Sequence, residues 1–189
     1  GPVILEPQDY LLKGSEDSTF IDNNGLLGGA IYASGSSIPL VITGSTFDGN
    51  AALDGGAIYV DGMPTTISMT EFTNNAGITG AGAVHFTTTT ADSLTVAYSN
   101  FVANSTTGDA AGSVYADAPG SDVAIRGSHF CGDLGGIKGA SVSVMDASTY
   151  DMLGSTVALS GSRPSVWLEG DFGVYTIANV TFAGMLNQA

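Results

Sequence analysis

The sequence predicts an all-β protein, specifically a right-handed parallel β-helix of about six to seven coils. Two observations carry this prediction: a pair of short motifs recurs every 25 to 29 residues, and the residues between them alternate between apolar and small or polar types. The composition agrees, because 27 glycines among 189 residues favour short strands joined by tight turns. A propeller blade needs a longer repeat and a leucine-rich repeat needs a leucine framework, so neither fits this period.

Each repeat begins at a phenylalanine, and the phenylalanines set the register. They are Phe20, Phe47, Phe72, Phe101 and Phe130, separated by 27, 25, 29 and 29 residues. Three positions after each stand Asn23, Asn50, Asn75, Asn104 and Asp133. We expect the phenylalanines to form an internal column. We expect the asparagines to form a structural ladder at a corner of the coil, because asparagine tolerates a left-handed backbone and hydrogen-bonds the local backbone.

A second motif lies 11 to 13 residues after each phenylalanine, where an aliphatic residue follows a pair of small residues. The aliphatic residues are Ile31, Ile58, Val84, Val114 and Val142, which we expect inside the helix. Adjacent strand residues point to opposite sides, so the residues that follow are predicted to form an outward stripe of Tyr32, Tyr59, His85 and Tyr115. Two roles are open for this stripe: it stiffens the sheet, or it contacts sugar rings or another protein.

A third segment of each repeat is an alternating run whose last apolar residue lies five positions before the next phenylalanine. These runs contain Leu40/Ile42, Thr65/Ile67, Leu94/Val96 and Val123/Ile125. One repeat cannot bury its apolar face alone. If each coil returns directly above the previous one, equivalent residues stack about 4.8 Å apart and the strands pair in parallel. The general handedness of parallel crossovers makes the helix right-handed.

The repeats cover nearly the whole chain, so we expect a single domain over residues 3–189. Residues 20–142 hold the clear repeats, and residues 143–189 hold degenerate, aromatic-rich terminal coils. Residues 3–19 are expected to cap the first coil, because an open β-helix end exposes strand edges. Residues 1–2 are typical of the remnant of a cleaved tag.

The terminal coils contain Trp167, Phe172, Tyr175 and Phe182. Two interpretations are open for these aromatic residues: they fill and cap the core of the last coils, or they form a docking surface.

The charge of the chain argues against nucleic acid as a partner. Eighteen acidic and four basic residues give a formal charge of −14, whereas a polyanion needs clustered Lys or Arg. No stretch reaches the roughly 18 apolar residues of a membrane-spanning helix, so we do not expect the chain to span a membrane. Cys131 is the single cysteine and allows no internal disulfide.

Candidate catalytic carboxylates are not placed like those of a glycosidase, which needs two carboxylates facing each other across a groove. The pairs Asp48 with Asp54 and Asp109 with Asp117 fall in predicted turns and loops. A polyuronate lyase needs a cation near the abstracted proton, and the four basic residues are scattered. We therefore expect no catalytic residue.

Metal and cofactor signals are also missing from the sequence. His85 and His129 occupy different positions of the repeat, so they do not predict a paired metal site. We expect no cofactor. Loop aspartates and carbonyls are suitable ligands for weak calcium binding, although no calcium-loop motif is present.

The motifs carry a resemblance to a known family. The segment "GGAI" begins at Gly28 and Gly55, with the variants "AGAV" at Ala81 and "AGSV" at Ala111, and four Phe-x-x-Asn motifs alternate with them. Over residues 20–130 this order resembles the repeats of chlamydial polymorphic outer membrane proteins. The resemblance implies an exported β-helix that acts in adhesion at the cell surface.

The sequence therefore favours a non-catalytic extracellular or cell-surface β-helix scaffold, either an adhesin-like repeat or a subunit of a larger assembly. The expected partner is another protein or a surface glycan. Candidate binding residues are Tyr32, Tyr59, His85, Tyr115 and Trp167. The alternative is a carbohydrate-active β-helix protein, either a polysaccharide-binding module or an enzyme of the lyase or hydrolase type.

Overall fold

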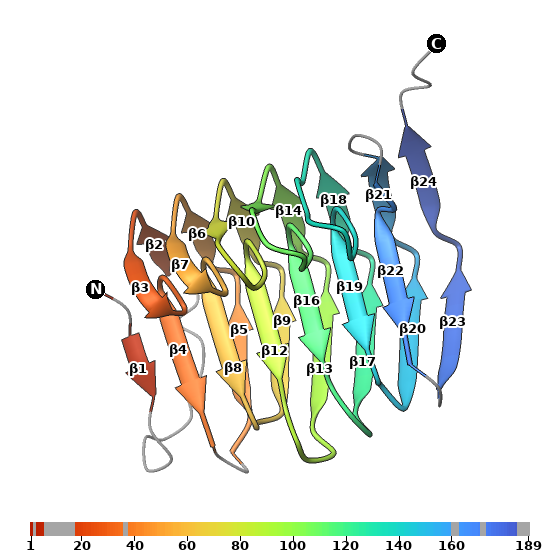
Figure 1. The fold of residues 1–189 in the computed structure, drawn as a ribbon, viewed down its shortest axis with the longest axis horizontal. Helices are drawn as coiled ribbons and strands as arrows, with labels where there is room; N and C mark the ends of the chain where they lie inside the picture. The colour runs from red at the N-terminus through yellow and green to blue at the C-terminus, as the bar shows by residue number, and fades with distance from the viewer. Residues whose placement is uncertain (2, 6–17, 36–37, 160–162, 171–172, 185–189) are drawn as a thin grey trace.

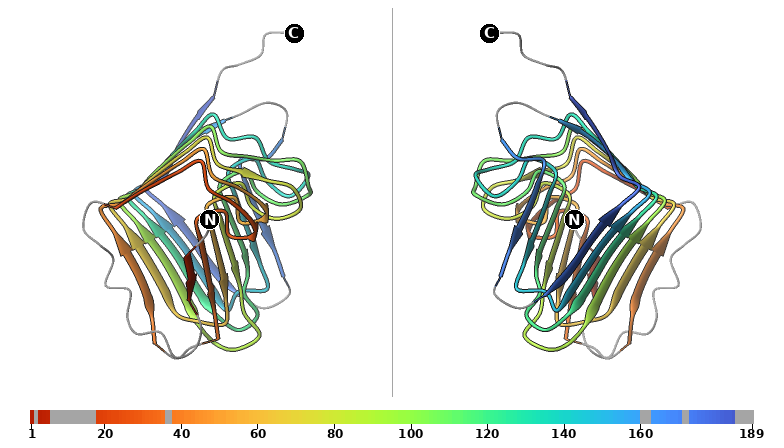
Figure 2. Two further views of the ribbon diagram at one scale, coloured as in Figure 1. Left: turned by 90° about the vertical axis from the view of Figure 1, so that its left-hand side faces the viewer. Right: turned by 90° about the vertical axis from the view of Figure 1, so that its right-hand side faces the viewer.

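The chain forms a parallel β-solenoid of about 6 turns in a computed structural model. The structure describes residues 1, 3–5, 18–35, 38–159, 163–170 and 173–184. These residues contain strands, turns and bends and no helix. Seen from the N-terminal end, the chain turns clockwise as it recedes from the viewer (Figure 2, left), which is the right-handed sense. The prediction of an all-β parallel helix is confirmed (Figure 1).

The described strands form four parallel sheets, which we call sheets A to D. Sheet A contains β1 (Val3–Leu5), β4 (Ile31–Ser34), β8 (Ile58–Asp61), β12 (Val84–Thr87), β16 (Val114–Asp117), β19 (Val142–Met145) and β22 (Val166–Glu169). Sheet B contains β5 (Leu40–Thr43), β9 (Thr65–Ser68), β13 (Ser93–Ala97), β17 (Asp122–Arg126), β20 (Thr149–Leu153) and β23 (Val174–Ala178).

Sheet C contains β2 (Thr19–Ile21), β6 (Thr46–Asp48), β10 (Glu71–Thr73), β14 (Asn100–Val102), β18 (His129–Cys131), β21 (Thr156–Leu159) and β24 (Thr181–Gly184). Sheet D is shorter and contains β3 (Asn24–Leu27), β7 (Ala51–Asp54), β11 (Ala76–Gly77) and β15 (Ser105–Thr106). A coil runs through sheets C, D, A and B in that order, so the same position of every repeat returns to the same sheet.

The phenylalanines lie in one column inside sheet C. Strand pairing aligns Phe20, Phe47, Phe72, Phe101 and Phe130. Successive ring centroids are 4.7 to 4.9 Å apart, and the ring planes differ by 6° to 8°. The same register places Val157 and then Phe182 after Phe130. The column therefore continues through a coil that has valine in the phenylalanine position.

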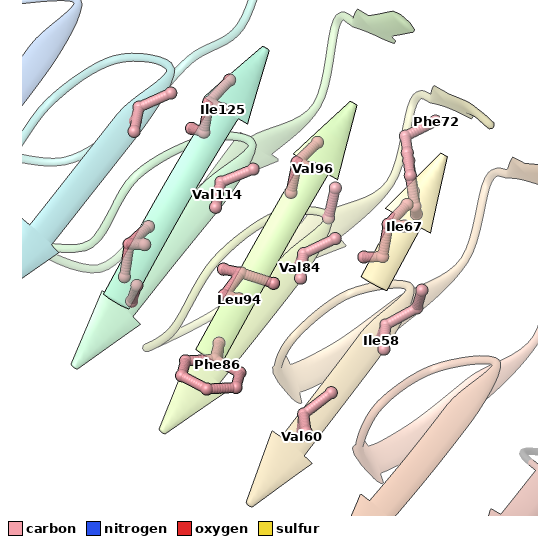
Figure 3. Close-up of a cluster of buried hydrophobic side chains, with 14 of the residues drawn as sticks. Ile58, Val60, Ile67, Phe72, Val84, Phe86, Leu94, Val96, Val114 and Ile125 are labelled. Atoms are coloured by element: carbon pink, nitrogen blue, oxygen red, sulfur yellow. The ribbon is translucent and has the colours of Figure 1, made fainter. Parts of the chain in front are cut away.

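Apolar columns from sheets A and B fill the rest of the interior. Ile58, Val84 and Val114 are aligned in sheet A, and Ile67 and Val96 are aligned in sheet B. All five are fully buried, and Figure 3 shows them among the other core side chains of these strands. Burial of these columns makes each coil depend on its neighbours, as expected for a repeat that cannot bury its apolar face alone.

The asparagine ladder joins successive coils. The backbone N–H of Asn50 donates to Oδ1 of Asn75, and that of Asn75 donates to Oδ1 of Asn104, each at 3.0 Å. Asn75 also donates through Nδ2 to the carbonyl oxygen of Phe47 at 3.0 Å. The ladder begins at Asn23, whose backbone N–H donates to Asn50. These bonds run between coils and so differ from the local bonds expected from the sequence.

The left-handed corner lies one residue before each asparagine, which corrects the expectation that asparagine itself adopts this conformation. The residues with positive φ are Asp22, Gly49, Asn74, Ala103 and Gly132. With the turn made by the preceding residue, each ladder side chain points inward. Burial of the Asn104 side chain also leaves no room for a glycan at this Asn-x-Thr sequon.

A second ladder, of hydroxyl groups, lies at the corner between sheets B and C. The backbone N–H groups of Thr70 and Ser99 donate to Oγ of Ser99 and Ser128, respectively, at 3.2 Å. Ser128 donates through its backbone N–H to Oγ of Ser155, also at 3.2 Å. This ladder was not predicted from the sequence. Its signal is a Ser or Thr two positions before every phenylalanine of the repeat.

The chain ends add coils to the solenoid. Strand β1 pairs in parallel with β4 beneath the first full coil, and the rest of the expected N-terminal cap, residues 6–17, lies outside the described residues. At the other end Tyr175 is aligned with Tyr150, and Phe182 with Val157. Both Tyr175 and Phe182 are partly exposed, and Phe172 lies outside the described residues.

Candidate recognition face

The five candidate binding residues lie in one column on the outer side of sheet A. Strand pairing aligns Tyr32, Tyr59, His85, Tyr115, Ser143 and Trp167 in that order. From the sequence, Trp167 was expected in a separate aromatic cluster of the terminal coils. The structure instead makes it the sixth member of the stripe, with a buried serine between it and Tyr115. The sequence signal for this position was the equivalence of Val166 and Val142 in the repeat. It is hard to recognise because the repeat is degenerate in this part of the chain.

The first four rings of the column contact one another. The centroids of Tyr32 and Tyr59 are 5.8 Å apart, with the planes inclined by 34°. The His85 ring packs edge-on between Tyr59 and Tyr115, with centroid distances of 4.8 and 4.9 Å. These contacts give a continuous row of rings across four coils, a geometry that favours contact with flat or cationic groups where the rings are exposed.

The loops between sheets D and A cover part of this column. The His85 side chain is 12% exposed, and Tyr59 and Tyr115 are half-buried. A side chain at Gly80 would overlap the imidazole of His85 and the carboxylate of Asp54 unless these side chains moved, so this loop lies directly against both. The loops project outward beside the upper ends of the sheet A strands (Figure 2). They shield part of the aromatic stripe, which is therefore less exposed to solvent than the sequence suggested.

A second outer column runs beside the aromatic one, two residues further along each strand. It consists of Ser34, Asp61, Thr87, Asp117, Met145 and Glu169. Its carboxylates flank the aromatic column on one side, and Asp54 from the end of β7 approaches it on the other. We call these two outer columns of sheet A, together with Asp54, the aromatic–acidic face.

Burial and the carboxylates both affect the tyrosines. Burial raises the pKa of Tyr59 to about 12, and the negative charges of Asp61 and Asp54 add to this effect. Burial likewise raises the pKa of Tyr115, with further contributions from Asp117 and Glu169. Both phenols therefore stay protonated at neutral pH, in a local field that disfavours additional negative charge.

His85 stays neutral in this environment. Burial lowers its pKa to about 4, and the carboxylate of Asp54, with Oδ1 3.8 Å from Nδ1 of His85, opposes this effect only in part. Nδ1 of His85 has no hydrogen-bond partner among the described residues. His85 consequently acts at neutral pH as one more uncharged ring of the column.

A lysine side chain already lies on the C-terminal part of this face. Nζ of Lys138 is 3.1 Å from Oε2 of Glu169 and 3.5 Å from Sδ of Met145. The hydroxyl of Tyr115 donates to the same sulfur at 3.1 Å, and Nε1 of Trp167 donates to Oε2 of Glu169 at 3.2 Å. These bonds from Lys138 and Trp167 lower the pKa of Glu169.

The candidate catalytic carboxylates are placed in different elements. Asp48 ends β6 in sheet C, and Asp54 ends β7 in sheet D. Asp109 lies in the loop before sheet A, whereas Asp117 ends β16 within that sheet. Among the described residues, no three His, Cys, Asp or Glu side chains form a group able to hold a metal ion.

Comparison with known proteins identifies one repeat. Residues 44–61 match the family model of the Chlamydia polymorphic membrane protein repeat. In the structure this segment runs from the corner at Gly44 through Phe47 and Asn50 to the end of β8, which carries Tyr59 and Asp61. No curated protein and no solved structure gave a significant match. No helix in the described part of the chain is long and apolar enough to cross a membrane.

Proposed function

We propose that the protein is a non-catalytic β-helix scaffold of the cell surface that recognises a partner through the aromatic–acidic face of sheet A. It acts either as an adhesin-like repeat or as a subunit of a larger surface assembly. The observation that carries this proposal is the alignment of Tyr32, Tyr59, His85, Tyr115 and Trp167 in one column beside a column of carboxylates.

Two further findings support the proposal. Residues 44–61 match the repeat model of a membrane protein family, and the matched segment includes three residues of the face, Asp54, Tyr59 and Asp61. A β-helix is also a rigid stack, since each coil pairs with its neighbours through several parallel strands. A rigid stack presents side chains at fixed spacing, and rigid surfaces bind with less loss of conformational entropy.

Location is tested on intact cells of the native source. Surface biotinylation followed by detection with an antibody against the chain should label the protein, while a cytosolic marker stays unlabelled. Labelling only after lysis contradicts a surface location. In parallel, purified protein should release no products from a panel of polysaccharides in hydrolysis and elimination assays, and turnover contradicts a non-catalytic role.

A further inference from the structure

We propose that the aromatic–acidic face binds an extended, lysine- or arginine-bearing segment of a partner protein. This inference rests on the proposed function and names the chemistry of the partner. It follows from the charge of the face, its aromatic surface, the position of Lys138 and the spacing of the carboxylates.

The charge of the face favours a cation. Asp61 and Asp117 belong to the same outer column, and neither forms an ion pair among the described residues. The protein as a whole carries a formal charge of −14. Such a potential attracts positively charged segments and increases their association rate. An anionic partner, including an acidic polysaccharide, would be repelled by the same potential.

The aromatic column supplies the second half of a cation site. An ammonium or guanidinium group is attracted to the face of an aromatic ring and also to a carboxylate at the side of that ring. Tyr59 and Tyr115 present this combination, because Asp61 and Asp117 stand two residues after them on the same strands. Their phenol rings also provide apolar area for the methylene groups of a lysine side chain.

Lys138 shows that the face accepts a lysine. Its ammonium group lies beside Met145 and Glu169, in the coils that carry Ser143 and Trp167 of the aromatic column. The molecule thus occupies the C-terminal end of its own face with a lysine. The carboxylates nearer the N-terminus, Asp61 and Asp117, form no such ion pair in the described part of the chain, although the positive charge of Lys138 acts on Asp117 from beyond ion-pair distance.

The spacing of the two carboxylates fits an extended peptide. Asp61 and Asp117 are separated by one intervening strand, β12, so they lie roughly 9.6 Å apart at the usual distance between strands. A polyproline II helix rises about 3.1 Å per residue and places every third side chain on one side, about 9.3 Å apart. Aromatic-lined surfaces are known hosts for this conformation. A peptide with a basic residue at every third position therefore matches the face.

The test uses a dye-labelled peptide of repeated Lys-Pro-Pro units, titrated with the whole chain by fluorescence anisotropy at about 0.05 M and then about 0.15 M salt. The matched control peptide has the same composition with its lysines grouped at one end. We expect saturable binding that is weaker at the higher salt. We also expect the repeated peptide to bind more tightly than the grouped one. Equal binding of the two peptides, or no binding, overturns the inference.

Substitutions that each remove one negative charge test whether the peptide binds at the aromatic–acidic face. Asp61→Asn and Asp117→Asn should each weaken binding about threefold, and the double variant about tenfold. Glu71→Gln removes one exposed charge from sheet C and should leave the affinity unchanged. Tyr115→Ser should weaken binding about threefold, and serine already occupies this column at Ser143. Equal losses for Glu71→Gln and Asp61→Asn would indicate unspecific attraction and reject the face.

Substitution of Lys138 should change the peptide affinity in the opposite direction. Lys138→Gln frees Glu169 and should strengthen peptide binding about threefold, whereas Arg126→Gln removes a positive charge from sheet B and should not. Circular dichroism must show the same fold for each variant. If neutral oligosaccharides bind and Tyr115→Ser abolishes their binding, the face is a glycan surface and the inference is wrong. If the protein is found at the cell surface but does not bind the peptide, the proposed function stands and only this inference is rejected.

Discussion

The backbone N–H of Asn104 donates to Oδ1 of Asp133 at 3.1 Å, so a buried aspartate takes the fifth position of the asparagine ladder. Burial raises the pKa of Asp133 to about 7, although bonds from Ser113 and Asn104 partly oppose the shift. Its second oxygen has no partner among the described residues. The ladder thus contains one group that resists ionisation at neutral pH.

Asp133 should make stability fall as the pH rises. In the unfolded chain the carboxyl titrates near 3.8, whereas in the folded protein it titrates near 7, so the native state holds an extra proton between these values. The stabilisation is complete below about pH 4 and is lost by about pH 7, a change on the order of 4 kcal/mol. Denaturant unfolding at a series of pH values measures it.

Asp133→Asn should remove that slope and stabilise the protein at pH 7. The new amide can donate to the carbonyl oxygen of Phe101, as Asn75 donates to that of Phe47. Glu71→Gln, at an exposed position of sheet C, serves as the control and should keep the slope. An unchanged slope in Asp133→Asn would show that the carboxyl ionises freely in the folded state.

His85 should contribute a slope of opposite sign. Its pKa is about 4 in the folded protein and 6.5 ordinarily, so the unfolded chain binds the extra proton between these values. Stability is therefore lost as the pH falls from about 6.5 to 4, on the order of 3 kcal/mol. His85→Phe keeps a ring in the column and should abolish this loss in the same unfolding series. A loss that persists in His85→Phe would contradict the assignment to His85.

The second glycine of the "GGAI" motif is required by close approach between coils. A Cβ at Gly56 would overlap the carbonyl oxygen of Gly82 in the next coil, whereas a Cβ at Gly62 meets no atom within 4 Å. Gly56→Ala should lower the free energy of unfolding by more than about 3 kcal/mol, because backbone must move. Gly62→Ala should cost about 1 kcal/mol, since only its positive φ opposes the change. Similar midpoints for both variants in thermal melts would contradict this explanation.

Much of the fold could be predicted because the repeat is regular at its phenylalanine and aliphatic positions. The phenylalanine spacing fixes the register of sheet C, and the aliphatic residues that follow fix sheet A. The position of Trp167 could not be predicted, because Val157 replaces phenylalanine at the start of its own coil and Ser143 replaces tyrosine in the coil before.

Two features of the candidate face also could not be predicted from the sequence. The path of a loop does not follow from its length, so the sequence could not show that the Gly80 loop covers His85. The carboxylates of Asp61 and Asp117 stand at the ends of strands, and only the strand register shows that they share a column with Glu169. The acidic half of the face was therefore missed, whereas its aromatic half was expected.

The in-register stacking of sheet A underlies the whole account, and disulfide trapping tests it most directly. With Cys131 replaced by serine, the pair Ser34→Cys and Asp61→Cys should form a disulfide readily, because these residues are aligned on neighbouring strands. The pair Ser34→Cys and Thr87→Cys lies two coils apart, roughly 9.6 Å, and should stay reduced. Mass spectrometry after mild oxidation is expected to show the first bond alone. Cross-linking of the second pair, or of neither, would contradict the stacking.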